Sequence, residues 1–256
     1  MRKNKLKEIW KSGGTVLCGW LHIPNTWTAE LMSHAGFDSV TVDMQHGLQS
    51  METAIQMMQA ISTTDVVPLA RSNWNEPGSI MRLLDGGAYG MICPMINTRQ
   101  ECEAFVGACR YPPMGYRSLG PTRARIYGGA DYGEHANEEI LTFAMIETKE
   151  AVANIDAINS VEGLDAIFVG SGDLMLSYTG KASHGNNSAF FDEAIETILK
   201  SCEKHNIIAG IWCASIAESK KMMDKGFRFI ALKSDSMMLN DIARQSASDL
   251  RNCLNS

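Results

Sequence analysis

The chain has 256 residues, of which 45% are hydrophobic and 20% are charged, and its formal net charge is −6. This length is close to the roughly 250 residues of one (β/α)8 barrel, and it allows a large core without disulfides. The negative charge argues against nucleic acid as a partner. No stretch approaches the roughly 18 uninterrupted apolar residues of a membrane-spanning helix, so we expect no contact with a membrane.

Seven cysteines are present, an odd number without a C-x-x-C pair, and this argues against a disulfide framework. Cys18, Cys93 and Cys213 lie inside apolar runs. We therefore expect reduced thiols, most of them in the core, and a cytoplasmic protein. The basic N-terminus MRKNKLKEIW lacks the apolar run of a signal peptide.

In chain order, eight short apolar runs alternate with helical patterns. The runs are 15–23, 39–45, 66–71, 90–96, 141–147, 166–170, 207–213 and 228–234. Most carry β-branched residues, which is typical of strands buried on both faces. The patterns between them predict helices with recognisable ends. For example, we expect Asn75 to cap a helix that carries Pro77 in its first turn and ends at Gly86-Gly87.

Eight strands alternating with helices predict a parallel sheet that closes into a (β/α)8 TIM barrel, as a single domain over residues 1–256. The alternative is an open doubly wound sheet, which often carries a Gly-rich phosphate loop after its first strand. No G-x-G-x-x-G follows the run 15–23. Two long connections, 97–140 and 171–206, lie on or reach the side where barrel enzymes build their sites.

Charged side chains stand at the ends of four apolar runs. The second run ends with Asp43-Met44-Gln45-His46-Gly47, Arg71 ends the third, Glu147 ends the fifth, and Asp173 follows the sixth. Because the C-terminal ends of barrel strands meet at one face, we expect these side chains to share one site.

These residue types suit an anion-and-metal site. Glu147 and Asp173, from neighbouring strands, would bind a hard divalent cation such as Mg²⁺ or Mn²⁺ and leave positions open for substrate oxygens. Arg71 can hold a carboxylate or a developing oxyanion in its planar fork. His46, with Asp43 nearby in the sequence, is a candidate general base.

Structural roles are the alternatives for several of these residues. Arg71 could have a purely structural role and pair with Glu147 or Asp85, and Asp173 could cap the segment that follows it. Trp20 and Trp212, in the first and seventh runs, could line the pocket, although core packing is the commoner role for such residues.

The chain resembles the HpcH/HpaI family, the class II 2-oxo-acid aldolases of the 4-hydroxy-2-oxoheptanedioate aldolase type in the phosphoenolpyruvate/pyruvate barrel superfamily. The resemblance extends from about Gly19 to Asp235. It is carried by VDMQHG at 42–47, the segment 68–98, RYPPMGYRSLGP at 110–121, MIETKEAVANID at 145–156 and IFVGSGDL at 167–174.

The resemblance implies a divalent metal ion, Mg²⁺, Mn²⁺ or Co²⁺, bound by Glu147 and Asp173. It implies that Arg71 binds the pyruvyl oxygen and stabilises the enolate, and that His46 is the acid/base residue. The backbone N–H groups around Gly172 and Asp173 would hold the pyruvate carboxylate.

Other implications concern the borders of the site. Asp85 matches a family aspartate that helps the site near the subunit boundary. Many family members have Glu at the position of Gln45, near the substrate, and Gln at the position of Met145. These two differences leave the choice of substrate and the pH dependence of this chain open. The family implies a homo-oligomer, commonly a hexamer built as a trimer of dimers, with a swapped last helix.

The expected reaction is the reversible cleavage of a 4-hydroxy-2-oxo acid to pyruvate and an aldehyde, without a Schiff-base lysine. One alternative is a citryl- or malyl-CoA type lyase of the same superfamily, although such enzymes are usually longer and need basic residues for CoA. A second alternative is a catalytically silent barrel that binds 2-oxo acids. The presence of a candidate base, His46, argues against it, since binding alone needs no base.

Overall fold

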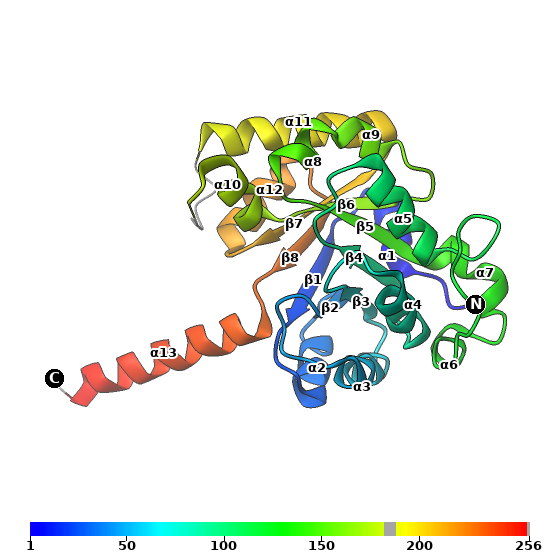
Figure 1. Cartoon of the computed structure of the whole chain (residues 1–256). Helices are drawn as coiled ribbons and strands as arrows, with labels where there is room; N and C mark the ends of the chain where they lie inside the picture. The colour runs from blue at the N-terminus through cyan, green and yellow to red at the C-terminus, as the bar shows by residue number, and fades with distance from the viewer. Residues whose placement is uncertain (182–187, 255–256) are drawn as a thin grey trace.

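The computed structural model describes residues 1–181 and 188–254. Eight parallel strands follow one another in chain order and close into a barrel, since β8 pairs with β1 (Figure 1). The strands are β1 (Val16–Leu21), β2 (Ser39–Asp43), β3 (Val67–Arg71), β4 (Gly90–Cys93), β5 (Leu141–Ile146), β6 (Ala166–Val169), β7 (Ile208–Cys213) and β8 (Phe229–Leu232). Each lies within one of the eight apolar runs, so the predicted (β/α)8 barrel is confirmed.

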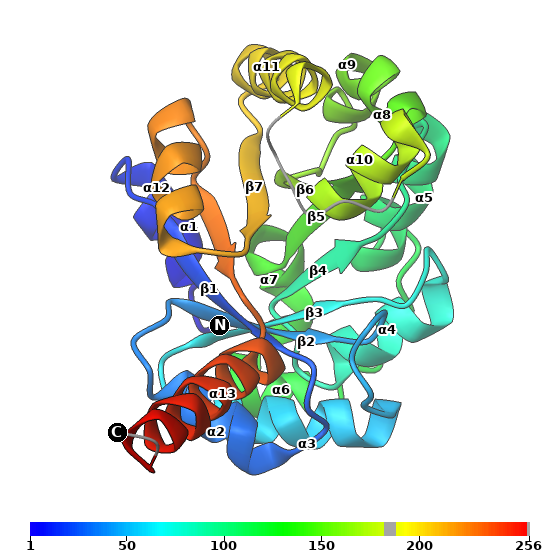
Figure 2. The same ribbon diagram turned by 90° about the vertical axis from the view of Figure 1, so that its left-hand side faces the viewer.

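Helices surround this barrel, as Figure 2 shows. Those up to β5 are α1 (Lys5–Lys11), α2 (Thr26–Ser33), α3 (Met51–Ile61), α4 (Pro77–Asp85), α5 (Arg99–Cys109), α6 (Ala124–Gly128) and α7 (Tyr132–Glu139). Those after β5 are α8 (Lys149–Ala153), α9 (Ile155–Asn159), α10 (Ser171–Thr179), α11 (Ala189–His205), α12 (Ile216–Lys225) and α13 (Asp235–Leu254). None of the described helices is long and apolar enough to span a membrane.

The interior of the barrel is filled by aromatic side chains. Trp10 of α1 lies edge-on to Phe143 and Phe229, whose rings are 4.9 Å apart. Phe229 contacts Phe168, which stacks on Trp20 at 5.3 Å. Aromatic pairs of this kind add to the free energy of core burial. The column ends at Trp20, near the C-terminal end of β1.

Helix α4 illustrates how local signals set the elements. It begins at Pro77 and is capped at its C-terminal end by Gly86, as predicted. Its N-cap is Glu76, whose carboxylate accepts two backbone N–H groups of the first turn, so the predicted cap at Asn75 is wrong. Asn75 instead donates its side-chain N–H to the Glu101 carbonyl at 3.0 Å, which links α4 to α5.

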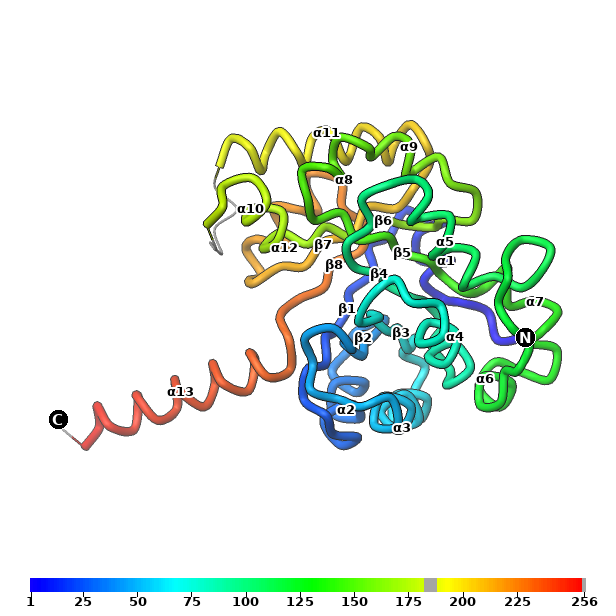
Figure 3. Tube along the Cα trace, viewed as in Figure 1, coloured from blue at the N-terminus to red at the C-terminus, as the bar shows by residue number. Residues whose placement is uncertain are grey.

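The last helix, α13, extends away from the barrel (Figures 1 and 3). Its first residue, Asp235, is buried, and its carboxylate accepts the backbone N–H groups of His22 and Ile23 at 2.8 and 3.2 Å. Beyond this anchor, the helix exposes the apolar side chains of Leu239, Ile242, Leu250 and Leu254. The final helix, α13, therefore does not cover the barrel of its own chain.

Candidate active site

A cavity of about 560 Å³ opens at the C-terminal ends of the strands. The residues that line it come from the ends of β1, β3, β5, β6 and β7 and from the starts of α10, α12 and α13. The residues predicted from the sequence that line it are Trp20, His46, Arg71, Glu147, Gly172, Asp173 and Trp212. Side chains that are far apart in the chain thus meet where barrel enzymes carry their sites.

An ion pair between Asp43 and Arg71 lies at the floor. The register of β2 and β3 places these residues side by side, and both are buried. The guanidinium Nε donates to Asp43 Oδ1 at 2.8 Å, and Nη2 donates to Oδ2. The remaining nitrogen, Nη1, is 3.8 Å from Met145 Sδ, another residue of the cavity wall. Arg71 therefore pairs with Asp43 and not with Glu147, and its fork is fixed.

Asp43 does not line the cavity but holds the residues that do. It also accepts the indole N–H of Trp20 and the backbone N–H of Gln45, each at 3.0 Å. Burial opposes ionisation of this carboxyl, but hydrogen bonds from His22, Arg71 and Trp20 outweigh it and hold the pKa of Asp43 well below its usual range. Trp20 is therefore both a core residue and an oriented part of the cavity wall.

Two carboxyl groups share one side of the cavity, because β5 and β6 are neighbours. Glu147 directly follows β5 and is buried, and its Oε1 accepts the backbone N–H of Met95 at 2.7 Å. Burial raises the pKa of Glu147 to about 7, and the charge of Asp173 adds to this, while the Met95 hydrogen bond and Arg71 oppose it. A nearby cation would favour the ionised form of this carboxyl and lower its pKa.

Gly170 leaves the space that the Glu147 carboxylate occupies. A Cβ at this glycine would lie 2.3 Å from Glu147 Oε2. Helix α10 begins at the next residue, and Asp173 lies in its first turn without acting as a cap. The first intrahelical bond comes from the N–H of Leu174, so the N–H groups of residues 171–173 precede it. Such a helix start favours bound anions.

The donor set fits a hard divalent cation. Glu147 and Asp173 supply carboxylate oxygens, and the cavity beside them leaves room for oxygens of a substrate. Among residues 1–181 and 188–254, no cluster of three or more His, Cys, Asp or Glu side chains surrounds a metal position. A cation held here would thus have few protein ligands, which is typical of a catalytic metal.

The remaining predicted residues lie less centrally. The side chain of His46 lines the cavity, whereas Gln45 does not, and the buried Oε1 of Gln45 has no hydrogen-bond partner in the described part of the chain. Asp85 ends α4, which leads back to the start of β4 at the opposite end of the barrel, and there it accepts a hydrogen bond from Arg117 at 2.7 Å. The structure does not bring Asp85 into this cavity, and its role across a subunit boundary stays a prediction.

Several residues of the wall were not predicted from the sequence. They include His22, Phe168, Glu218 and Met237. His22 had a usable signal, because it stands near the C-terminal end of the apolar run 15–23. Glu218 and Met237 had none, since they lie inside helical segments that follow β7 and β8.

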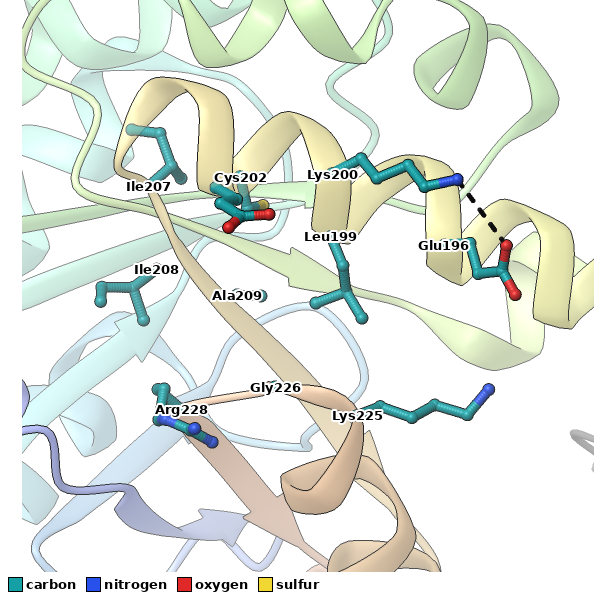
Figure 4. A pocket seen from close by; sticks show the side chains of 11 residues that line it. Glu196, Leu199, Lys200, Cys202, Ile207, Ile208, Ala209, Lys225, Gly226 and Arg228 are labelled. Atoms are coloured by element: carbon teal, nitrogen blue, oxygen red, sulfur yellow. Dashed lines mark ion pairs between the residues drawn. The ribbon is translucent and has the colours of Figure 1, made fainter.

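A second hollow, shown in Figure 4, lies between α11 and α12 on the outside of the barrel. Leu199, Ile207 and Ile208 give it an apolar floor, and Lys200 is paired with Glu196 at its edge. It lies beside the start of β7 and carries no group comparable to the buried carboxyls. The strand-end cavity is therefore the better candidate for chemistry.

Comparison with known proteins gives consistent results. The family described as HpcH/HpaI aldolase/citrate lyase matches residues 17–241. A hydroxypyruvate/pyruvate aldolase of Rhizorhabdus wittichii is 38% identical over 248 residues, which cover 97% of this chain and 99% of that protein. A 4-hydroxy-2-oxo-heptane-1,7-dioate aldolase of Salmonella dublin is 33% identical over 242 residues, covering 93% and 90%.

A similar fold is also found among solved structures. The crystal structure of an HpcH/HpaI aldolase/citrate lyase family protein from Burkholderia cenocepacia superposes with a TM-score of 0.91. It is 25% identical, and the match covers 97% of this chain and 100% of that one. The likeness therefore extends over the whole barrel.

Proposed function

Because the chain belongs to the HpcH/HpaI aldolase family, we propose that it is a divalent-metal-dependent lyase that reversibly cleaves a 4-hydroxy-2-oxo acid to pyruvate and an aldehyde. The observation that carries the proposal is the pair Glu147 and Asp173 beside the fixed guanidinium of Arg71 in one cavity. Glu147 and Asp173 leave space for a metal ion on one side of the cavity, and the fixed guanidinium of Arg71 lies on another side. This arrangement suits a substrate that carries a carboxylate and a neighbouring oxo group.

Glu147 and Asp173 are the residues that would hold the cation. A divalent ion at this position, Mg²⁺, Mn²⁺ or Co²⁺, would polarise the 2-oxo group of a substrate. The raised pKa of Glu147 fits this role, because a cation would replace the proton that the buried carboxyl otherwise keeps.

The start of α10 would bind the carboxylate of the substrate. The N–H groups of Gly172 and Asp173 belong to its first turn, and no side chain caps this end. The helix dipole and the N–H groups together favour a negative group. The substrate would thus lie with its 2-oxo acid end against β6.

Arg71 would stabilise the negative charge that develops on the 2-oxo oxygen as the C3–C4 bond breaks. Asp43 fixes two of its nitrogens, so Nη1 needs no reorganisation to meet this charge. Donors that are already oriented contribute most of this kind of catalysis. His46 is the proposed acid/base residue, since its side chain lines the same cavity.

The test is a panel of reactions with the purified protein. We expect carbon–carbon bond formation from pyruvate or hydroxypyruvate with short aldehydes in the presence of Mg²⁺ or Mn²⁺, followed by chromatography of the product. Cleavage of CoA thioesters in place of these reactions would show a CoA-dependent lyase. Binding of pyruvate without turnover of any compound would show a silent barrel.

We also propose that the chain forms a homo-oligomer, a hexamer built as a trimer of dimers with exchanged C-terminal helices. Helix α13 has a row of exposed apolar side chains and leaves its own barrel (Figure 3). Leu17 is 44% exposed although it lies in β1, and Leu31 of α2 is 60% exposed. An apolar helix and an uncovered apolar barrel face in one chain complement each other between copies.

A further inference from the structure

One side of the cavity wall lies apart from the groups that would hold the 2-oxo acid end of a substrate. Those groups, Arg71, Glu147 and Asp173, stand at the ends of β3, β5 and β6. The other side comes from the ends of β1 and β7 and from α12 and α13, and it includes His22, Trp212, Ala214, Glu218 and Met237. Because β8 lies between β7 and β1 in the closed sheet, these elements are neighbours, and we call them the β7–β1 side.

Glu218 contributes a carboxylate to the β7–β1 side. It lies in the first turn of α12, where its backbone N–H donates to the capping side chain of Ser215 at 3.2 Å. Its side chain reaches back over the start of the helix, and Oε2 accepts the backbone N–H of Ala214 at 2.8 Å. Ala214 itself lines the cavity. The half-buried carboxylate is therefore held at the cavity wall, close to the end of β7.

The positive charges of the cavity lie elsewhere. Within residues 1–181 and 188–254, the lining of the cavity includes no lysine, and its one arginine is Arg71. Arg71 stands at the end of β3 and is already paired with Asp43. His22 belongs to the β7–β1 side, but its ring Nε2 lies 2.9 Å from Asp43 Oδ2. A negative group of a substrate placed on this side would therefore meet the carboxylate of Glu218.

The part of a substrate beyond C4 would lie along the β7–β1 side. In the proposed function, the start of α10 takes the substrate carboxylate, and the Glu147–Asp173 pair and Arg71 take the 2-oxo group. These contacts use the walls at β3, β5 and β6. The cavity of about 560 Å³ leaves room beyond a pyruvate unit, and this room is bordered by β7, α12, α13 and β1.

Glu218 favours one class of aldehyde through its charge and its hydrogen-bonding capacity. An ionised carboxylate only accepts hydrogen bonds, so the hydroxyl groups of a substrate can donate to it. A second carboxylate at the same place would be repelled. Trp212 and Met237 supply apolar surface for a short carbon chain. The β7–β1 side therefore suits a short, neutral aldehyde that carries hydroxyl groups.

We propose that Glu218 determines the aldehyde class of this enzyme, selecting neutral, hydroxylated aldehydes and excluding aldehydes that carry a carboxylate. The inference rests on the proposed aldolase function and deepens it. Glu218 is a specificity-determining residue and takes no part in proton transfer. Because addition and cleavage pass through the same transition state, the selectivity applies to the reaction in both directions.

Two aldehydes that differ in charge test the proposal. Succinate semialdehyde carries a carboxylate, and its methyl ester has the same chain without the charge. With pyruvate and Mg²⁺, we expect kcat/KM for the ester to exceed that for the acid at least about tenfold, because two like charges several ångströms apart repel each other at an intermediate dielectric. In Glu218→Gln the two values should come within about threefold, since glutamine keeps an acceptor for the Ala214 N–H but has no charge.

A second pair of aldehydes tests the hydroxyl preference. Glyceraldehyde and propanal both have three carbons, and only glyceraldehyde has hydroxyl groups that can donate to a carboxylate. We expect a higher kcat/KM for glyceraldehyde, and a smaller preference in Glu218→Gln. The KM for pyruvate should be unchanged in this variant, since the 2-oxo acid end of the substrate lies at β5 and β6.

Glu101→Gln is the matched control. Glu101 also lies in the first turn of a helix, α5, and its carboxylate also accepts backbone N–H groups of preceding residues, those of Asn97 and Thr98. It does not line the cavity, so the ratio of ester to acid should stay that of the unsubstituted protein. Glu218→Asp keeps the charge and should keep the preference for the ester.

Equal use of succinate semialdehyde and its ester by the unsubstituted protein would overturn the role of Glu218, and this comparison needs no variant. A ratio that Glu218→Gln leaves unchanged would overturn it as well. In both cases, product formed from pyruvate and either aldehyde would leave the proposed aldolase function standing. If pyruvate gives no product with any of the four aldehydes, the proposed function fails, and the inference fails with it.

Discussion

Arg71 is held in position by one carboxylate. Its Nε and Nη2 bind Asp43, and only Nη1 is left for a substrate. Lys has a single ammonium and cannot both pair with Asp43 and keep a fixed donor on the cavity side. We predict that Arg71→Lys lowers kcat about 100-fold or more, by analogy with the removal of oxyanion-hole donors. Steady-state kinetics of pyruvate formation would measure this.

A matched control is Arg99→Lys, because Arg99 is exposed and pairs with Glu103 one helical turn away. Exposed pairs of this kind contribute little to stability. The control should keep its turnover. If Arg71→Lys turns over as fast as the control, the role of Arg71 is structural.

The raised pKa of Glu147 has a consequence for the stability of the metal-free protein. Folding raises this pKa from an ordinary 4.5 to about 7, so the native state binds the proton more tightly than the unfolded state. The group's contribution is therefore complete below pH 4.5 and is lost as the pH rises through about 7. At 1.36 kcal/mol per pKa unit, the loss is about 3 kcal/mol.

Glu147→Gln removes this titration and can still accept the Met95 N–H. We predict that the metal-free variant is about as stable as the original protein near pH 5 and more stable at pH 8, by up to about 3 kcal/mol. Urea unfolding at both pH values, with a chelator present, measures the difference. An equal difference at pH 5 and pH 8 would show that Glu147 is not the titrating group.

The residues of the site were only partly predictable. Arg71, Glu147 and Asp173 end or follow apolar runs, and the barrel rule alone predicts that they meet. The partner of Arg71 depends on the register of β2 and β3, which sequence patterns do not give, so Asp43 was not identified as the shared acceptor. His22 stands near the end of the run 15–23, but its hydrogen bond to Asp43 depends on how β1 and β2 are placed, which the sequence pattern does not give.

At the scale of elements, the link between β6 and α10 determines where the Glu147 carboxylate can lie. Gly170 stands in this link, and a Cβ there would collide with Glu147 Oε2. We predict that Gly170→Ala displaces the Glu147 carboxylate and weakens Mn²⁺ binding at least about tenfold. Titration calorimetry with Mn²⁺ would measure the affinity.

Gly120→Ala is the control for this substitution. The added Cβ would meet only Asp85 Oδ2, at 3.9 Å, which is an ordinary contact. We expect its Mn²⁺ affinity to be unchanged. Equal affinities in the two variants would mean that Glu147 does not need its present position to bind the ion.

The strands were predictable because a buried parallel strand has a continuous apolar signature. The ends of helices were less predictable from the sequence. At α4, two residues with cap-forming side chains stand in succession, Asn75 and Glu76, and the contact of Asn75 with α5 leaves the cap to Glu76. A tertiary contact therefore decided which residue caps this helix.

At the scale of the whole molecule, a single chain does not explain why α13 exposes a row of apolar side chains. If copies exchange this helix, a hexamer of 28.1 kDa chains has a mass of about 169 kDa. We predict that the double variant Ile242→Glu and Leu250→Glu breaks this assembly, because both side chains are exposed and apolar in one chain. Light scattering coupled to size exclusion measures the mass.

The control is Ser248→Glu, since helical periodicity places residue 248 on the side opposite Leu239. It adds a charge to α13 without touching the apolar row, and its mass should stay that of the original protein. A monomeric original protein, or a double variant that keeps its mass, would rule out the exchanged helix.

The complete cavity wall is also a property of the whole barrel. Glu218 reaches it from α12, which packs against β7 and β8, and Met237 reaches it from α13, which packs against β1, so both depend on the closure of the sheet. No local pattern marks such residues. The resemblance to the aldolase family implied roles for Glu147 and Asp173, but it did not point to these side chains from α12 and α13.

The central claim is that Glu147 and Asp173 support metal-dependent pyruvate chemistry in this cavity. Exchange of the C3 protons of pyruvate with deuterium, followed by proton NMR, tests it without knowledge of the aldehyde. We predict exchange above the protein-free rate with Mg²⁺, none after chelation, recovery when Mg²⁺ returns, and at least about 100-fold slower exchange in Glu147→Gln. Exchange that continues at full rate in the chelated protein, or in Glu147→Gln, would contradict the claim.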